Sequence, residues 1–396
     1  TILDADEIIL MATGEHKAPI VQEAVEEPPT REVTASYLQE HRDATFYVDR
    51  AAGGELTRVK TPWLVREVDW TKQGAKRAVI WLSQTLDKAI PRLESGDFYR
   101  NQLHGLLHRY DHIDNLTREV FEDLRQRIKY QEDIISGERV IVFSPHPDDD
   151  VISMGGMLST LVENDNDVTV AYMTSGNVAV FNADVRRYLR FIELSSEALD
   201  IGEEDLEGFR ERREKIEAFF DDKDPGEVDL PEVQDLKAHI RAGEAVAATG
   251  VIGLDPGDAR FLDMPFYKTG RVRKDPISEA DVEVVLELLE KVEPTNIFVA
   301  GDLSDPHGTH RMCYQAIDEA LQQYRGTVAG GNGEASETKA DPRVWLYRGA
   351  WQEWEPHRAD VFLPLSKADL DCKVEAIYKH ESQKDRAMFP GAYDER

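Results

Sequence analysis

The sequence has few cysteines and no long apolar run. Its 396 residues include two cysteines, Cys313 and Cys372, which are far apart and not in a Cys-x-x-Cys pair. A disulfide scaffold is therefore excluded because it needs several pairs of cysteines, and a cysteine-rich zinc site is excluded because it needs closely spaced thiols. The longest apolar stretches are about the length of a strand, well short of the ~20 residues that cross a bilayer. The sequence therefore predicts no membrane-spanning segment.

Positively charged residues are also much fewer than negatively charged ones. The chain carries 47 Lys and Arg against 77 Asp and Glu, a formal net charge of −30 at pH 7. Nucleic-acid binding is not expected, because a phosphate backbone requires a basic surface. An anionic membrane surface would repel the chain for the same reason. With 41% hydrophobic and 31% charged residues, the composition is typical of a folded globular protein with a strongly solvated surface.

The first residues, Thr-Ile-Leu-Asp, do not resemble a signal peptide, since no basic stretch precedes an apolar core. We therefore expect a cytoplasmic protein, and the sequence leaves open whether it forms a homo-oligomer. The first residue is not methionine, so we also expect that the chain is cut from a longer one.

The first 65 residues read as the end of an α/β domain. Apolar or extended runs at 8–12 and 45–48 predict two strands, and a helical pattern covers 17–25. So short a segment cannot bury a core of its own, which favours an incomplete domain over residues 1–65. Residues 66–136 show helical periodicity and no strand pattern, and we interpret them as a helical connector.

Three histidines in the connector, His104, His108 and His112, follow one another at intervals of four residues. In a continuous helix this spacing would place them on one face, as in a metal site or a proton relay. No carboxylate motif accompanies them. A surface or interface face of a connecting helix is therefore the favoured interpretation.

Strands and helices alternate from residue 137 onward. Strands are predicted at 139–144, 168–173, 260–262 and 296–300. This alternation predicts an α/β fold, a Rossmann-like and mostly parallel sheet with helices on both faces. A helical segment rich in Arg, Glu and Asp, at about 184–235, interrupts the pattern and is interpreted as an insertion.

Two of the predicted strands end in histidine and aspartate. The first strand runs into Ser144–Asp150 (Ser-Pro-His-Pro-Asp-Asp-Asp), and the last is followed by Asp302–His310. Ligands bind at the carboxyl ends of strands in open α/β sheets, so both segments are expected at one edge. Two histidines and one carboxylate would leave a coordination place for water, as in catalytic zinc sites, and a second carboxylate could take its proton. The alternative is an acidic turn with incidental histidines.

These segments resemble the LmbE-like (PIG-L) N-acetylglucosamine deacetylases. The resemblance rests on His146–Asp149 and His307–His310, with Thr174–Gly176, Arg241–Ala245 and Phe261–Tyr267 in the expected order between them. It covers about residues 137–385 apart from the insertion, and it implies that residues 137–396 form a deacetylase domain.

The resemblance also implies roles for individual residues. His146, Asp149 and His310 would hold Zn²⁺, although this donor set suits other divalent ions too. Asp148 would be the general base that deprotonates the attacking water. His307 would stabilise the oxyanion and help to protonate the leaving amine.

Arg241 corresponds to a helix arginine that contacts substrate. Arg190 has the same Arg-x-x-Glu spacing and is a rival, but the helix of Arg241 leads directly into the 261–265 segment, which favours Arg241. Two positions depart from the family pattern. Asp150 stands where Glu is frequent, and Thr309 stands where many members have Asp. Without a carboxylate at 309 we expect His307 to titrate lower, which weakens its acid role and not the metal site.

The front of the chain resembles the C-terminal part of the glucosamine-6-phosphate deaminase/isomerase family. The resemblance rests on Thr13–Ala18, Ser36–His41 and Leu56–Thr61. It implies that Lys17, at a helix N-terminus, is a phosphate ligand; an ordinary surface lysine is the alternative. The catalytic carboxylates and histidine of that family have no counterpart here. We therefore expect the rear of a deaminase–deacetylase fusion that cannot deaminate by itself.

The function expected from these observations is removal of acetyl from an N-acetylated amino sugar or a related glycoconjugate, a small-molecule substrate. Two alternatives remain: a part of a deaminase fusion in amino-sugar phosphate metabolism, or a non-catalytic sugar-phosphate binding module. Late aromatic residues could line a sugar subsite or pack in the core of a late strand. These residues are Trp345, Tyr347, Trp351 and Trp354.

Overall fold

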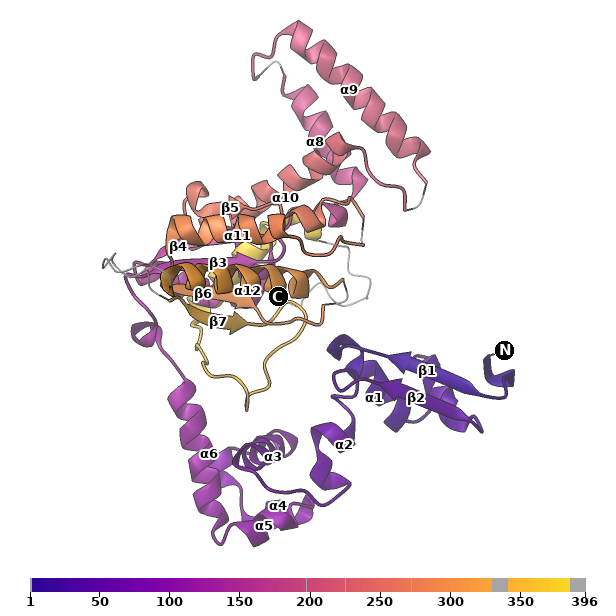
Figure 1. Ribbon diagram of the computed structural model, residues 1–396, viewed down its shortest axis with the longest axis vertical. Helices are drawn as coiled ribbons and strands as arrows, with labels where there is room; N and C mark the ends of the chain where they lie inside the picture. The colour runs from indigo at the N-terminus through magenta and orange to yellow at the C-terminus, as the bar shows by residue number, and fades with distance from the viewer. Residues whose placement is uncertain are drawn as a thin grey trace. The chain divides into compact units, whose positions relative to one another are not determined.

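The computed structural model describes residues 2–196, 198–224, 226–271, 273–305, 307–329 and 341–384, with the backbone alone at 326–329. The chain divides into two compact units. Unit 1 comprises Thr1–Lys129 and Trp354–Pro364, and unit 2 comprises Tyr130–Glu353 and Leu365–Arg396. Figure 1 shows the elements of both units. No helix in the described part of the chain is both long and apolar enough to cross a membrane.

Unit 1 begins with a small parallel β-sheet. Strands β1 (Ile8–Ala12) and β2 (Ala44–Val48) pair in parallel over their full lengths. Helix α1 (Ala18–Glu26) connects them and packs Val21 against Ala52 and Leu56. The two strands and the helix predicted for this segment are confirmed to within one residue at each end.

The rest of unit 1 is helical. Helix α3 repeats small and apolar residues at helical spacing, and these pack against Phe98 and Leu116. The other helices are α2 (Thr57–Lys60), α4 (Ser95–Arg100), α5 (His104–Arg109) and α6 (Ile113–Arg127), and α3 itself covers Lys72–Thr85.

The single helix face predicted for the three histidines is wrong. Helix α5 contains His104 and His108 but ends at Arg109, because Tyr110 adopts an extended backbone. His112 is the residue before the first turn of α6, and its backbone is extended as well. The histidines therefore belong to two helices and form no continuous row.

Asp97 is a buried carboxylate that ties the α4 turn together. It accepts hydrogen bonds from Lys88 Nζ (2.6 Å), Glu94 N (2.9 Å) and Arg100 Nη2 (2.8 Å). The bond from Lys88 and that from the Glu94 amide hold the pKa of Asp97 below its ordinary value. A lowered native pKa means that the ionised form stabilises the fold at neutral pH, and that this contribution is lost as the pH falls below about 4.

We therefore expect Asp97→Asn to lower the free energy of unfolding by about 1–3 kcal/mol at pH 7. Urea unfolding of both proteins at several pH values measures the difference, which should shrink as the pH falls below about 4. A difference that is constant from pH 7 to pH 3 would contradict the role given to the ionised carboxylate. Asp87→Asn, at an exposed turn nearby, is the control.

Unit 2 is built on a five-stranded parallel sheet with the order β5-β4-β3-β6-β7. This order confirms the mostly parallel, Rossmann-like fold expected from the alternation of strands and helices. The strands are β3 (Arg139–Ser144), β4 (Asp167–Tyr172), β5 (Ala259–Phe261), β6 (Asn296–Ala300) and β7 (Arg343–Tyr347).

Helices cover both faces of this sheet (Figure 1). Val140 and Val142 of β3 point to one side, where α7, α10 and α13 pack, and Ile141 and Phe143 point to the other, where α11 and α12 pack. A strand buried on both faces needs an unbroken apolar run, which β3 and β6 have. The helices are α7 (Asp149–Glu163), α10 (Pro231–Ile252), α11 (Glu279–Val292), α12 (Thr309–Ala329) and α13 (Lys367–Tyr378).

The charged segment that interrupts the pattern forms two helices, α8 (Asn182–Leu194) and α9 (Glu203–Asp222). Ion pairs connect the two helices, and Arg186 contacts Glu217 and Asp221 at 2.6 Å each. The predicted end of the insertion at 235 falls inside α10, because Pro231 occupies the first turn of that helix.

Residues 354–364, which the sequence analysis placed in the deacetylase domain, pack in unit 1. Phe362 N donates to Arg127 O at 2.8 Å, and Lys129 N donates to Phe362 O at 2.9 Å. Arg127 Nη1 also donates to Ala359 O at 2.6 Å. The chain therefore leaves unit 2 after β7, contributes this segment to unit 1, and returns to form α13.

Candidate metal centre and active site

The site lies where the order of strands reverses. Strands β3 and β6 are parallel neighbours at the centre of the sheet, and the chain leaves them toward opposite sides. Their carboxyl ends therefore open a crevice, the usual ligand site of an open α/β sheet. The Ser144–Asp150 segment enters it from β3, and residues 302–305 and 307–310 enter it from β6.

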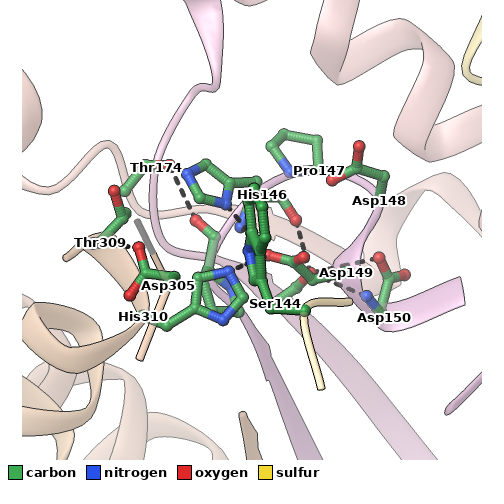
Figure 2. Close-up of polar contacts among 12 residues, drawn as sticks. Ser144, His146, Pro147, Asp148, Asp149, Asp150, Thr174, Asp305, Thr309 and His310 are labelled. Atoms are coloured by element: carbon green, nitrogen blue, oxygen red, sulfur yellow. Dashed lines mark hydrogen bonds and ion pairs between the residues drawn. The ribbon is translucent and has the colours of Figure 1, made fainter. Parts of the chain in front are cut away.

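The three predicted metal ligands come together in this crevice. One ligand atom each from His146, Asp149 and His310 lie within 4.8 Å of one another. Asp149 Oδ2 is 3.1 Å from His146 Nδ1 and 3.2 Å from His310 Nε2. Figure 2 shows these side chains, which come from the loop after β3, the start of α7 and the start of α12. The spatial prediction made from the two sequence motifs is thus met.

The donor set fits a divalent cation. His310 Nε2 is buried and makes no hydrogen bond within the described structure. Buried polar atoms without a partner are uncommon, and a ring nitrogen that lies 3.2 Å from a carboxylate oxygen without a hydrogen bond is placed as two ligands of one metal ion would be. Asp149 and the two imidazoles together supply the two nitrogens and one carboxylate typical of a catalytic site.

A second carboxylate orients His310. Asp302, at the carboxyl end of β6, has Oδ1 2.9 Å from His310 Nδ1, and its Oδ2 accepts from Trp351 N at 3.1 Å. Burial opposes the charged imidazole, but Asp149 and Asp302 outweigh it and raise the pKa of His310 to about 10. A metal ion at Nε2 would have to displace that proton. The sequence analysis gave Asp302 no role; its place eight residues before His310, after a buried strand, was the available signal.

Asp302→Asn should therefore weaken metal binding without removing a ligand. Such partners of ligating histidines are worth about 10–100-fold in metal affinity, because they fix the ring and increase its basicity. Competition with a fluorescent chelator measures the affinity of the variant. The variant Asp318→Asn is a control, since Asp318 is exposed on α12, the helix of His310, and accepts a hydrogen bond from Gln322; equal losses in both variants would contradict the role given to Asp302.

Asp148 lies beside the three candidate ligands and is held by Arg241. Arg241 Nη2 is 3.2 Å from Asp148 Oδ1 and donates to Pro147 O at 2.9 Å. Burial raises the pKa of Asp148, and the Arg241 charge opposes that rise. Gly176 covers the guanidinium at φ +62°, and a Cβ there would come within 3.1 Å of Arg241 Nε. Arg241 is thus fixed against the predicted base, while its Nε and Nη1 have no hydrogen-bond partner in the described structure.

The C-terminal segment packs on the same helix. Ser382 donates its backbone N and its Oγ to the Glu244 carboxylate, both at 2.7 Å. Glu244 is three residues after Arg241 on α10, so the segment is fixed close to the guanidinium. Burial and the Arg241 charge lower the pKa of the neighbouring His380 to about 3, so this imidazole is neutral. The sequence analysis found no role for this segment.

Asp150, at the position where the family often has Glu, has a structural role in this chain. Asp150 is fully buried, accepts from Tyr172 Oη at 2.9 Å and from Ser144 Oγ at 3.2 Å, and lies beneath the ligand loop. Burial raises its pKa to about 7. Asp150 therefore supports the loop that carries His146 rather than facing a ligand.

The predicted acid, His307, lies at the outer side of the site. Its side chain is exposed and its ring lies 6.2 Å, centroid to centroid, from that of Trp351. Thr309, the other departure from the family pattern, is buried and its amide donates to Asp305 Oδ2 at 2.7 Å. Position 309 has no carboxylate of its own, and the carboxylate bonded to its backbone amide comes from Asp305, four residues upstream.

Other candidates from the sequence fall elsewhere. Arg190 is exposed on α8, so Arg241 is the arginine that reaches Asp148. Lys17 immediately precedes α1 in unit 1, at the helix N-terminus where it was expected. Trp345 stacks on Phe298 in the sheet at 5.6 Å and belongs to the core. Tyr347 and Trp354 are also outside the site, the first buried in the core of unit 2 and the second in unit 1.

A cleft of about 590 Å³ adjoins the loop of Asp148. Its walls are formed by Pro147, by Thr174 and Ser175 after β4, by one face of α10, and by the segment after β5. Tyr267 lines it, and the Tyr267 ring also lies 6.3 Å from that of His146. The cleft therefore lies beside the candidate metal centre, and Pro147 and Tyr267 of its lining are the residues next to His146.

One protein family matches the part of the chain that contains this site. The family is PIG-L, described as GlcNAc-PI de-N-acetylase, and the match covers residues 141–321. This range runs from β3 into α12 and includes all three candidate ligands. Residues 141–321 are a PIG-L domain. The resemblance drawn from the histidine and aspartate motifs is confirmed.

Curated relatives extend the comparison beyond the PIG-L domain. The whole chain is 40% identical to a glucosamine-6-phosphate deaminase-like protein of Bacteroides thetaiotaomicron over 410 residues, which are 60% of that protein. Its N-terminal part matches glucosamine-6-phosphate deaminases, at 51% identity over 55 residues for that of Lactobacillus helveticus. That match covers 14% of this chain and 23% of the deaminase. The chain thus spans 60% of the first relative and less than a quarter of the deaminase.

Solved structures that align with the chain include several deacetylases. The N,N′-diacetylchitobiose deacetylase from Pyrococcus horikoshii aligns with 70% of this chain and 82% of its own, at 19% identity and a TM-score of 0.37. A deacetylase of teicoplanin biosynthesis aligns with 62% of this chain and 88% of its own, at 13% identity and a TM-score of 0.35.

Proposed function

We propose that the PIG-L domain is a metal-dependent N-deacetylase that hydrolyses the acetamido group of an N-acetylated amino sugar or a related glycoconjugate. The observation that supports this most directly is the convergence of His146, Asp149 and His310 on one point with Asp148 beside them. The match of the same residues to a de-N-acetylase family supports the same chemistry.

We propose zinc as the ion held by His146, Asp149 and His310. Two nitrogens and one carboxylate suit it, although they also accept other divalent ions. Bound there, it would supply a water of lowered pKa and would polarise the acetamide carbonyl. The protein side chains then do the proton transfer and the positioning.

Asp148 is proposed as the general base. Its carboxylate would accept a proton from the water that attacks the carbonyl carbon, and the C–N bond then breaks to give acetate and a free amine. His307 is proposed to stabilise the negative charge on the carbonyl oxygen and to help protonate the departing nitrogen. Its position at the outer side of the crevice leaves the ring free to face a bound substrate.

Arg241 is proposed to act in substrate binding chiefly through Asp148. The ion pair at 3.2 Å and the bond to Pro147 O use Nη2 and fix the base relative to the ligand loop. Positioning of this kind supplies much of the advantage of an enzyme over a reaction in solution.

For unit 1 we propose that Lys17 contributes to a sugar-phosphate site. It precedes α1, whose N-terminal amides favour an anion. The match of the N-terminal part to glucosamine-6-phosphate deaminases supports this proposal. In the longer relative, we infer that such a site would serve amino-sugar phosphate metabolism. Phosphate titration of Lys17→Ala against the unchanged chain tests it, and equal affinities would overturn it.

The proposed deacetylase is tested by a substrate screen on the whole chain. The protein is loaded with zinc, and amine release is followed with N-acetylglucosamine, its 6-phosphate, N,N′-diacetylchitobiose and an N-acetylglucosaminyl glycoside. Metal content is measured on the same samples. Metal-dependent amine release from at least one of these sugars is expected. No release from any of them at one bound metal per chain would overturn the proposal.

A further inference from the structure

The cleft that adjoins Asp148 has an uneven distribution of charge. Among the described residues that line it, the only lysine is Lys268, no arginine lines it, and the one histidine is His239, one turn after Asp235 on α10. Lys268 Nζ is already 2.8 Å from Asp263 Oδ2. Asp235, on the cleft face of α10, is exposed and has no ion-pair or hydrogen-bond partner in the described structure. The lining therefore offers an unpaired carboxylate and no unpaired lysine or arginine.

The rest of the lining suits a neutral sugar. Phe261 is 41% exposed and stacks on Tyr172, with ring centroids 5.1 Å apart and planes 17° apart. An exposed aromatic face accepts the apolar side of a sugar ring. Around it, Ser175, Asn177 and Gln234 offer uncharged hydroxyl and amide groups for sugar hydroxyls.

Gln234, in the lining of the cleft, packs against Gly270. Gly270, at φ +64°, lies against the side chain of Gln234 on α10, and a Cβ there would come within 2.7 Å of Gln234 Nε2. This contact joins the loop after Tyr267 to the α10 wall.

We propose that the cleft selects an unphosphorylated N-acetylated amino sugar and disfavours the corresponding sugar phosphate. This selectivity rests on the deacetylase function proposed above and names the substrate class for the same site. A phosphate ester brings a charge of about −1.5 to −2 at neutral pH. Near the Asp235 carboxylate, without a free cation, such a group is repelled, so the released amine would be an unphosphorylated amino sugar.

Three other cations of the same loop lie outside the lining of the cleft, and of these Lys274 has its Nζ 4.6 Å from the centroid of the Tyr267 ring. Arg271 and Arg273 are exposed, and neither lines the cleft. If they did attract a phosphate, the preference would reverse, and that reversal is one of the outcomes measured below.

The first test compares two substrates that differ only in the phosphate. The zinc-loaded whole chain is assayed for amine release from N-acetylglucosamine and from its 6-phosphate. At low salt, kcat/KM is expected to be about tenfold higher for the neutral sugar, and the ratio should narrow at about 0.5 M salt because charges are screened there. Equal values at low salt, or a preference for the phosphate, would overturn the proposed selectivity.

A binding experiment separates this proposal from the proposed function. The zinc-loaded Asp148→Asn variant is titrated with both sugars by calorimetry, so no turnover is needed. In one outcome the Asp148→Asn variant binds the neutral sugar more tightly while the unchanged chain shows no turnover of either sugar. That result would overturn the proposed deacetylase function and support the proposed selectivity. Equal binding of the two sugars, or binding of neither, would overturn the selectivity even if the chain deacetylates other compounds.

A pair of charge variants tests whether the charge of the cleft determines the preference between the two sugars. Asp235→Lys should raise kcat/KM for the 6-phosphate about tenfold or more. Glu232→Lys makes the same change of charge on α10, but Glu232 does not line the cleft, and its exposed pair with Lys215 at 3.5 Å contributes little to stability. Glu232→Lys should change that kcat/KM less than about twofold. Equal gains in the two variants would assign the effect to net charge and overturn the role of Asp235.

Discussion

Replacing Asp148 with Asn is expected to abolish turnover and to leave the metal bound. The amide cannot accept the proton of the attacking water, and losing a general base costs about 10²–10⁴-fold in rate. The ligands His146, Asp149 and His310 are untouched, and the carbonyl oxygen of the introduced amide can still accept a hydrogen bond from Arg241 in place of the ion pair. Amine release at saturating sugar and metal content per chain are the two measurements.

The matched control for this variant is Asp167→Asn, at the exposed start of β4. It makes the same chemical change outside the crevice and should leave kcat within about twofold. An Asp148→Asn protein that keeps both its metal and its full rate would show that another group takes the proton. Circular dichroism of both variants establishes that they are folded.

Replacing His310 with Ala is expected to remove the metal altogether. The variant leaves two of the three protein ligands, and a site without its full donor set loses most of its affinity. After dialysis against a weak chelator, bound zinc should fall from near one per chain to about one tenth or less. In unfolding scans, added zinc should raise the melting temperature of the unchanged chain and not that of the variant.

His310 is fully buried, so its loss also leaves a cavity and deprives Asp302 of its partner. His146→Ala is therefore the companion variant, because the His146 side chain is 21% exposed and its removal disturbs packing less. Both variants should lose zinc. A folded His146→Ala protein that retains one zinc per chain would contradict the ligand set, whatever the behaviour of the His310 variant.

Much of the fold of unit 2 could be predicted because it depends on local patterns. Strands β3 and β6 are buried on both faces, and each therefore appears in the sequence as an apolar run bounded by polar residues. Alternation with helices then implies parallel pairing, and parallel pairing places the ends of β3 and β6 at one edge. The meeting of His146, Asp149 and His310 follows from these steps.

The parts of the site that could not be predicted depend on contacts between distant segments. Arg241 meets Pro147 across 94 positions, and Ser382 meets Glu244 across 138. Neither spacing has a pattern that a single sequence reveals. Asp302 is different, because its position at a strand end could be seen in the sequence. Its role was missed because only the orientation of the His310 ring shows that Nδ1 faces the Asp302 carboxylate.

The predicted row of three histidines failed for a local reason. Spacing by four implies one face only if the helix is continuous, and helical periodicity alone did not reveal the interruption at Tyr110. Short helices separated by three residues, as α5 and α6 are, preserve much of the apolar pattern of a longer helix. The same limit explains why the end of the insertion was placed inside α10.

The excursion of residues 354–364 into unit 1 has a practical consequence for dissecting the protein. A fragment that begins near residue 137 would contain Phe362 and Ala359 but not Arg127 and Lys129. It would therefore lack the backbone groups that bond Phe362 and the Arg127 side chain that donates to Ala359 O. The peptide groups of Ala359 and Phe362 would be left to solvent and the segment would be open to proteases. Expressing unit 2 by itself therefore calls for a redesigned short linker between Glu353 and Leu365, and unit 1 would need residues 354–364 supplied as a peptide or grafted after Lys129.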